Sequence, residues 1–138
     1  MPSVNRLQLG KIMIVDDEPQ NVSSYERLLK FEGFNNIASI TDPAKAVDLY
    51  KEFKPDIVLL DLDMPYLNGL EVMAQLNKIE TESYIPVLVI TARQEDKCVI
   101  KALEAGARDY VMKPFNNVEL LNRIKNILEV RMLHKDVQ

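Results

Sequence analysis

Short apolar runs alternate with longer amphipathic stretches, and this alternation constrains the fold more than any other feature of the chain. The runs occupy residues 12–15, 37–40, 57–60, 87–90 and 109–112, of which the second and the last are weaker. Because the runs lack polar alternation, they are typical of strands buried on both faces, as in a parallel sheet covered by helices.

The stretches between the runs have the length and apolar spacing of helices. We expect helices over about 19–32, 41–53, 68–79 and 94–105, and a fifth that starts near Pro114 and Asn116. Gly33 and Gly106 follow the first and fourth, as glycines often follow helices. Strands and helices alternating with right-handed crossovers predict an α/β fold of the (βα)5 type: a doubly wound, five-stranded parallel sheet, flavodoxin-like.

Charge and composition limit the classes of function open to the chain. Its 138 residues fit one domain, and a net charge of −4 gives no reason to expect a nucleic-acid or membrane-surface site. The single cysteine, Cys98, excludes an internal disulfide, and no apolar run approaches the ~20 residues of a membrane span. We therefore expect a cytoplasmic protein without a membrane span or direct nucleic-acid binding by this chain.

The last predicted helix is longer than a five-stranded sheet needs. No breaker interrupts it from Asn116 past Leu133, and its late apolar positions, Val130, Leu133 and Val137, suggest a short coiled-coil seam. A frayed tail and a signalling helix leading to an output domain are both open. We divide the chain into an N-terminal extension over 1–10, a domain over 11–130 and the start of a linker helix over 131–138.

Polar residues of a particular kind follow four of the five expected strands. Asp16 and Asp17 follow the first strand, Asp61 the third, Thr91 the fourth and Lys113 the fifth. The carboxyl ends of parallel strands meet at one edge of the sheet, so these side chains should converge. Crowded carboxylates would have raised pKa values unless a cation lay among them, and Mg²⁺ suits such a set.

These side chains together suit phosphoryl transfer, which depends mainly on positioning and charge stabilisation. The cation and Lys113 would each take one oxygen of the transferring group, and Thr91 with backbone N–H groups would take a third. Asp61 is a competent acceptor, because a carboxylate can form an acyl phosphate. Each residue alone has a plainer explanation as a cap, a turn or a solvated charge. Their ordered occurrence at successive strand ends favours a site.

The chain resembles the receiver domains of bacterial two-component response regulators over roughly residues 11–130. The segments that carry the resemblance are KIMIVDDEPQN at 11–21, PDIVLLDLDMPYLNGLEV at 55–72, IPVLVITA at 85–92 and AGARDYVMKPF at 105–115. The resemblance implies a switch phosphorylated by a histidine kinase, a phosphotransfer protein or a small phosphodonor. It implies no enzyme beyond limited self-phosphorylation and autodephosphorylation.

The resemblance also implies roles for individual residues. Asp61 would be the phospho-acceptor and a metal ligand, and Asp17 would bind Mg²⁺ directly, with Mn²⁺ able to substitute. Asp16 would act on the ion largely through water, and the backbone carbonyl of Asp63 would complete the ion's coordination.

Further implied roles concern the phosphoryl group and the output. Lys113 and the backbone N–H groups of Leu62 and Ala92 would contact the phosphoryl oxygens. Thr91 and Tyr110 match the switch pair, in which the hydroxyl moves toward the phosphoryl group and the ring turns inward. The face of the fourth helix, fifth strand and fifth helix would then change, to control a homodimer, a partner or an output domain. The tail after residue 128 resembles linkers of receivers that regulate cyclic-di-GMP enzymes.

Two other classes of protein are weighed against this one. The Asp61-Leu62-Asp63 pattern also fits an aspartyl-phosphate hydrolase of the haloacid-dehalogenase type, although there the acidic pair follows the nucleophile strand instead of preceding it. A receiver-shaped interaction module that is never phosphorylated is the third class. The intact set of acidic, hydroxyl and lysine residues argues against it.

Two geometric expectations are particular to the chain. The Lys113–Pro114 peptide should be cis, so that the lysine points into the acidic cluster while the chain turns into the last helix. Asp63 and Arg93 should flank the mouth of the site, where an ion pair between them would hinder water from reaching the acyl phosphate; two solvated charges that never meet are the open alternative.

Overall fold

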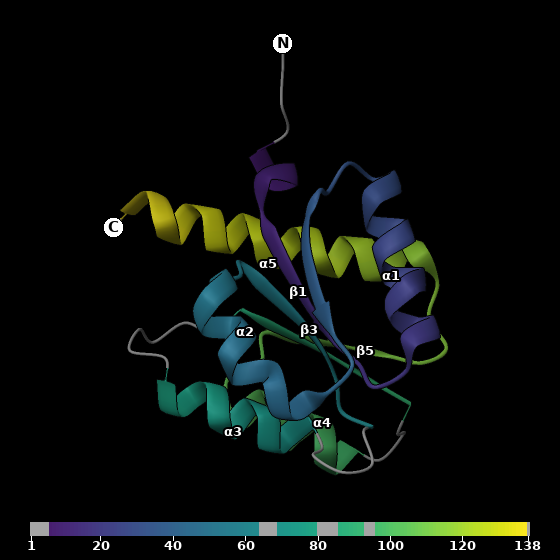
Figure 1. Cartoon of the computed structure of the whole chain (residues 1–138), viewed down its shortest axis with the longest axis vertical. Helices are drawn as coiled ribbons and strands as arrows, with labels where there is room; N and C mark the ends of the chain where they lie inside the picture. Colours follow the sequence, from purple (N-terminus) through teal and green to yellow (C-terminus); the bar gives the residue numbers. More distant parts are fainter. Residues whose placement is uncertain (1–5, 64–68, 80–85, 93–95, 138) are drawn as a thin grey trace.

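The computed structural model describes residues 6–63, 69–79, 86–92 and 96–137. Five parallel strands form one sheet in the order β2-β1-β3-β4-β5. The strands are β1 (Lys11–Val15), β2 (Asn36–Ile40), β3 (Ile57–Asp61), β4 (Val87–Thr91) and β5 (Asp109–Met112). The predicted α/β fold, a doubly wound (βα)5 sheet of the flavodoxin-like kind, is confirmed (Figure 1).

Helices cover both faces of the sheet, which explains why the central strands β1, β3 and β4 are mostly apolar and buried. The helices are α1 (Pro19–Phe31), α2 (Ala46–Phe53), α3 (Gly69–Ile79), α4 (Asp96–Glu104) and α5 (Asn117–Val137). Ile12 and Ile14 of β1 pack in one core with residues of α1 and α5. Met13 and Val15 pack in a second core with residues of α2, α3 and α4. Successive strand residues therefore bury opposite faces of the sheet.

Local signals in the sequence set most helix boundaries. Gly33 and Gly106 adopt φ values of 95° and 111°, the left-handed region in which a glycine carries no Cβ penalty. The Asp42 carboxylate accepts a hydrogen bond from the Ala44 N–H at 3.0 Å and begins a 3-10 turn, η2 (Pro43–Lys45), before α2. The second helix therefore begins later than expected. The Lys113–Pro114 peptide is cis, as predicted.

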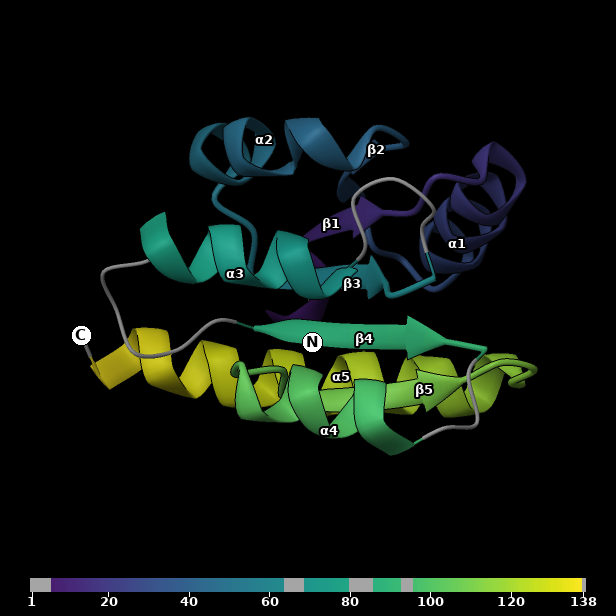
Figure 2. The same ribbon diagram turned by 90° about the horizontal axis from the view of Figure 1, so that it is seen from below.

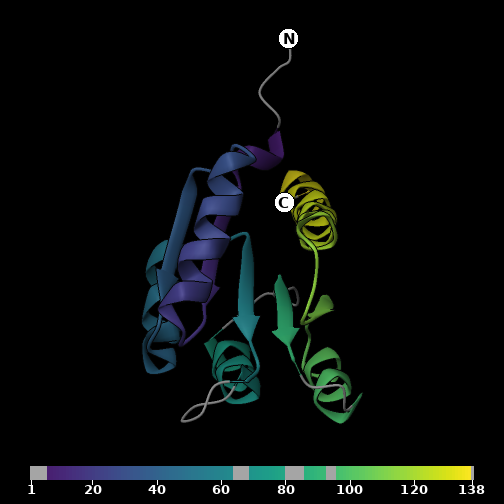
Figure 3. The same ribbon diagram turned by 90° about the vertical axis from the view of Figure 1, so that its right-hand side faces the viewer.

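The N-terminal residues and the end of α5 pack against each other (Figure 3). Leu7, in the 3-10 turn η1 (Arg6–Leu9), packs on the core that α1 and α5 share. A Cβ at Gly10 would lie 3.0 Å from the Leu128 side chain and 3.4 Å from that of Met132. The division of the chain at residues 10 and 130 stays a prediction.

The last helix, α5, is the longest of the described helices. Its 21 residues extend about 30 Å. Val130 and Leu133, from the expected seam, are 54% and 65% exposed. Neither α5 nor any other helix within the described ranges has both the length and the apolar character needed to cross a membrane.

Candidate functional site

The predicted site residues lie at the carboxyl edge of the sheet. Figure 2 shows the arrowheads of β1, β3, β4 and β5 pointing the same way. Asp61 and Thr91 are the last residues of β3 and β4, whereas Asp16 follows β1 and Lys113 follows β5. The parallel sheet thus brings together residues that are up to 97 positions apart in the chain (113 − 16 = 97).

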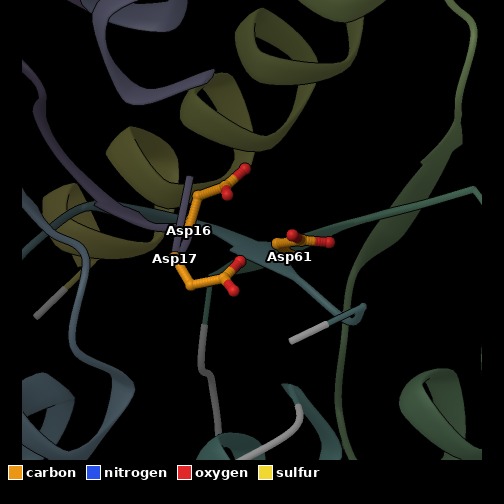
Figure 4. Close-up of side chains that lie close together, drawn as sticks. All are labelled: Asp16, Asp17 and Asp61. Atoms are coloured by element: carbon orange, nitrogen blue, oxygen red, sulfur yellow. The ribbon is translucent and has the colours of Figure 1, made fainter. Parts of the chain in front are cut away.

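Three carboxylates meet at this edge. Asp16, Asp17 and Asp61 each offer an oxygen, and these oxygens lie within 4.8 Å of one another (Figure 4). Asp16 and Asp61 are only 1% and 3% exposed, and Asp17 is half-buried. The structure therefore places these three predicted residues together.

Burial raises the pKa values of the two buried carboxyls, and the charge of a neighbouring carboxylate adds to each rise. Burial is the main cause that raises the pKa of Asp16 to about 6, and the charge of Asp61 adds to it. The Glu18 N–H and the Asn21 side chain donate to Asp16 at 2.9 and 3.3 Å and partly offset the rise. Sequence reasoning assigned no role to Asn21, which lies one helical turn into α1.

Asp61 has few compensating partners. Its Oδ1 accepts the Asp63 N–H at 2.9 Å and lies 3.5 Å from the Lys113 Nζ. Burial nevertheless raises the pKa of Asp61, and the Asp63 charge raises it further, while the Asp63 N–H and Lys113 lower it. The acidic cluster therefore carries more negative charge than its neighbours compensate.

The charge surplus fits a divalent cation. Hard cations such as Mg²⁺ bind carboxylate oxygens, and a cation here would stabilise the charged forms of Asp16 and Asp61, which burial chiefly disfavours. The cluster of Asp16, Asp17 and Asp61 has the ligand type and spacing that such an ion requires.

The Thr91 hydroxyl, which the resemblance assigns to the switch pair, has a partner that the sequence did not predict. The Thr91 hydroxyl donates to the Asp63 carboxylate, at 3.1 Å to Oδ1 and 3.4 Å to Oδ2. The Ala92 N–H donates to the same Asp63 Oδ2 at 2.6 Å. The only sequence signal for this contact was that Asp63 follows the acceptor by two residues. The expected partner of Asp63, Arg93, lies outside the described residues.

Two other predicted positions have defined surroundings. The Leu62 N–H donates to the Ile90 carbonyl at 3.0 Å, so a phosphoryl contact there would require this bond to break. The N–H group found at the acceptor carboxylate is instead that of Asp63. Tyr110, in β5, is 39% exposed, whereas Thr91 is fully buried. The metal role of the Asp63 carbonyl stays a prediction.

A parallel (βα)5 sheet that gathers carboxylates, a hydroxyl and a lysine at its carboxyl edge is the architecture of a phosphorylation-dependent signalling receiver. The response regulator receiver domain family matches residues 12–125, and the chain belongs to that family. The match decides against the haloacid-dehalogenase alternative that the Asp61-Leu62-Asp63 pattern had left open.

Curated relatives cover the same region. The chain is 39% identical to the DNA-binding response regulator MtrA of Mycolicibacterium smegmatis over 115 residues, which are 83% of this chain and 49% of that protein. It is 37% identical to the transcriptional regulatory protein PrrA of Mycobacterium tuberculosis over 121 residues, 88% of this chain and 51% of that protein. The chain thus spans about half the length of these relatives.

Solved structures agree with the assignment. A response regulator signal receiver domain from Bermanella marisrubri superposes with a TM-score of 0.77 at 31% identity, covering 86% of this chain and 97% of that one. A CheY-like receiver domain protein from Methanospirillum hungatei superposes with a TM-score of 0.83 at 25% identity, covering 91% of this chain and 98% of that one. The fold and the family are therefore supported independently.

Proposed function

We propose that Asp61 accepts a phosphoryl group from a histidine kinase, a phosphotransfer protein or a small phosphodonor. The observation that carries this proposal is the position of Asp61. Its carboxylate is buried at the end of β3, 3.5 Å from the Lys113 ammonium and within 4.8 Å of two further carboxylates. A carboxylate so placed has a cationic side chain on one side and a cation site on the other, which suits acceptance of an anionic group.

Asp16, Asp17 and Asp61 would hold Mg²⁺, or Mn²⁺ in its place, together with the Asp63 backbone carbonyl. When bound, the ion supplies positive charge that offsets the phosphoryl oxygens. This assignment accounts for carboxylates whose charged forms the fold disfavours, chiefly by burial, as the raised pKa of Asp16 indicates.

The chain's own residues supply the acceptor and the donors. An Asp61 oxygen attacks phosphorus, the bond from phosphorus to the donor's nitrogen or oxygen breaks, and the bonding pair leaves with the donor. Lys113 takes charge on one phosphoryl oxygen, and the Thr91 hydroxyl and Ala92 N–H are the nearby neutral donors. Water later cleaves the acyl phosphate, so the chain has limited self-phosphorylation and autodephosphorylation activity without being a general enzyme.

The test is phosphorylation by acetyl phosphate with Mg²⁺, followed by intact mass. We expect a gain of one phosphoryl group in the wild type and none in Asp61→Asn or after chelation of the metal. Asp42→Asn is the matched control, because Asp42 is an exposed carboxylate that caps η2 and does not belong to the acidic cluster. Equal labelling of Asp61→Asn and the wild type would refute the acceptor assignment.

The effect of phosphorylation should reach a partner through the face formed by α4, β5 and α5. Exposed apolar side chains lie on these elements: Ile100 and Leu103 on α4, Tyr110 on β5 and Val118 on α5. Movement of the Thr91 hydroxyl toward the phosphoryl group would make room for the Tyr110 ring and so change this face. We expect homodimerisation when beryllofluoride, a phosphoryl mimic, is bound. An unchanged sedimentation coefficient would show that the face serves another partner.

The identity of any output domain is a separate matter. The names of the matched relatives, a DNA-binding response regulator and a transcriptional regulatory protein, point to control of transcription in those proteins. They give no support to the cyclic-di-GMP output suggested by the tail, which stays a prediction. Within this chain we assign no surface to nucleic acid, and a cytoplasmic location remains our proposal.

A further inference from the structure

The donors that a phosphoryl group would need are already engaged in the structure. The Thr91 hydroxyl and the Ala92 N–H both donate to the Asp63 carboxylate, at 3.1 and 2.6 Å. The backbone N–H of Asp63 itself donates to Asp61 Oδ1 at 2.9 Å. The Asp63 carboxylate therefore occupies donors of the proposed phosphoryl site, beside the acceptor.

The chemistry of the two groups is alike. A carboxylate and a phosphoryl group are both anionic acceptors with several oxygens, and both form short, charge-assisted hydrogen bonds with N–H and O–H donors. The bond from Ala92 is of this short kind. One hydroxyl and one N–H cannot give the same protons to both anions at once, so the two anions compete.

The hydrogen bonds from Thr91 and Ala92 hold the Asp63 carboxylate beside Asp61 although the two carboxylates repel each other. The Asp63 charge is one of the causes that raise the pKa of Asp61, so the two carboxylates repel each other. The bonds from Thr91 and Ala92 offset this repulsion. A phosphoryl group on Asp61 would bring a charge of about −1.5 to −2, so the repulsion would grow while the same donors gained a stronger acceptor.

We propose that the Asp63 carboxylate is an internal competitor of the phosphoryl group. It holds the Thr91 and Ala92 donors in the unphosphorylated chain and withdraws when Asp61 is phosphorylated, so it reduces the apparent affinity of the site for phosphoryl groups and their mimics. The inference rests on the proposed function of Asp61. The apparent dissociation constant rises as the fraction of molecules with free donors falls, so 90% occupancy by Asp63 corresponds to about a tenfold weakening.

The first experiment measures binding of beryllofluoride in the presence of Mg²⁺ by calorimetry. We expect Asp63→Ala to bind it ~10-fold more tightly than the wild type, and Asp63→Asn, which keeps the shape without the charge, to show a smaller gain. Glu18→Gln is the control for charge alone, since Glu18 is exposed next to the acidic pair and its side chain has no bond to Thr91 or Ala92. A gain in Asp63→Ala no larger than that in Glu18→Gln would overturn the proposal.

The second experiment measures amide hydrogen exchange at Ala92 without metal or mimic. Ala92 is exposed, so only its bond to Asp63 protects the N–H among the contacts described. We expect exchange about tenfold faster in Asp63→Ala, a smaller increase in Asp63→Asn, whose amide oxygen can still accept the bond, and no change in Glu18→Gln. Equal exchange in all four proteins would overturn the competition. If exchange changes as expected but no protein binds beryllofluoride, the contact is real, but the site is not a phosphoryl site and both proposals fail.

Discussion

Two buried carboxylates flank β3, and their surroundings are opposite. Asp56 precedes the strand and Asp61 ends it, and each is 3% exposed. The Asp56 carboxylate accepts the Lys11 N–H at 2.9 Å and lies 3.3 Å from Arg131 Nε and 3.1 Å from Lys135 Nζ. Asp61 has one lysine at 3.5 Å and two further carboxylates nearby.

The difference separates a buried charge that the chain compensates from one that it compensates less. A buried carboxylate is tolerated when hydrogen bonds and cations compensate it, as they do at Asp56. At Asp61 burial and neighbouring charge instead raise the pKa, so the folded protein holds an anion that it does not fully stabilise. Uncompensated charge of this kind marks a site completed by something other than the chain itself.

Asp56 also fixes the direction of the last helix. Arg131 and Lys135 lie in the final turns of α5, and their bonds to Asp56 tie those turns to the beginning of β3. Of the two explanations for residues 131–137, a continuous helix fits the structure better than a frayed tail.

The largest effect on stability should come from the paired carboxylate. We expect Asp56→Ala to lower the free energy of unfolding by about 3 kcal/mol, because it leaves a buried N–H and two cations without their acceptor. The measurement is urea unfolding followed by circular dichroism. The loss should be largely independent of Mg²⁺, since Asp56 lies at the opposite end of β3 from the acidic cluster.

Two further variants serve as comparisons for the stability loss in Asp56→Ala. Lys135→Met should cost only about 0.5 kcal/mol, because the Lys135 side chain is 46% exposed and an exposed pair contributes little. Asp48→Ala removes an exposed carboxylate from the first turn of α2 and should change stability by about 0.5 kcal/mol or less. A loss at Asp56→Ala no larger than that at Asp48→Ala would remove the distinction between the two ends of β3.

The position of Asp61 in the acidic cluster could be predicted from the sequence, whereas the buried ion pairs of Asp56 could not. Asp61 could be found because it ends an apolar run, and parallel strands bring such ends together. Asp56 follows a proline and has the sequence signature of an ordinary turn residue. Its partners lie 45, 75 and 79 positions away, and no local pattern connects them.

Side-chain direction was the other limit of sequence reasoning. The spacing placed Asp63 near the mouth of the site, but it could not show that the carboxylate turns toward Thr91 and Ala92. The strand pairing that engages the Leu62 N–H with Ile90 likewise depends on the register between β3 and β4, which a single sequence does not contain. The fold and the residues of the site were therefore predictable, whereas several bonds among them were not.

A smaller effect, of opposite sign, should come from the uncompensated carboxylates. The folded-state pKa of Asp16 is about 6, raised from 3.8 by burial and by Asp61. Between pH 4 and pH 6 the folded protein therefore keeps a proton that the unfolded chain has lost, and the free energy of unfolding falls as pH rises through this window. Without metal, Asp16→Asn should be more stable than the wild type by about 1 kcal/mol at pH 7.5, with no gain at pH 4.

Urea unfolding in a chelator at pH 4, 6 and 7.5 measures this difference, with Asp48→Asn as the control for loss of an exposed carboxylate. Mg²⁺ at pH 7.5 should then reverse the order, because it binds the folded wild type and stabilises it by mass action, whereas Asp16→Asn lacks one carboxylate of the cluster. A stability difference that does not change with pH would mean that Asp16 is already compensated in the folded chain. The contrast with Asp56 would then lie in function alone and not in electrostatics.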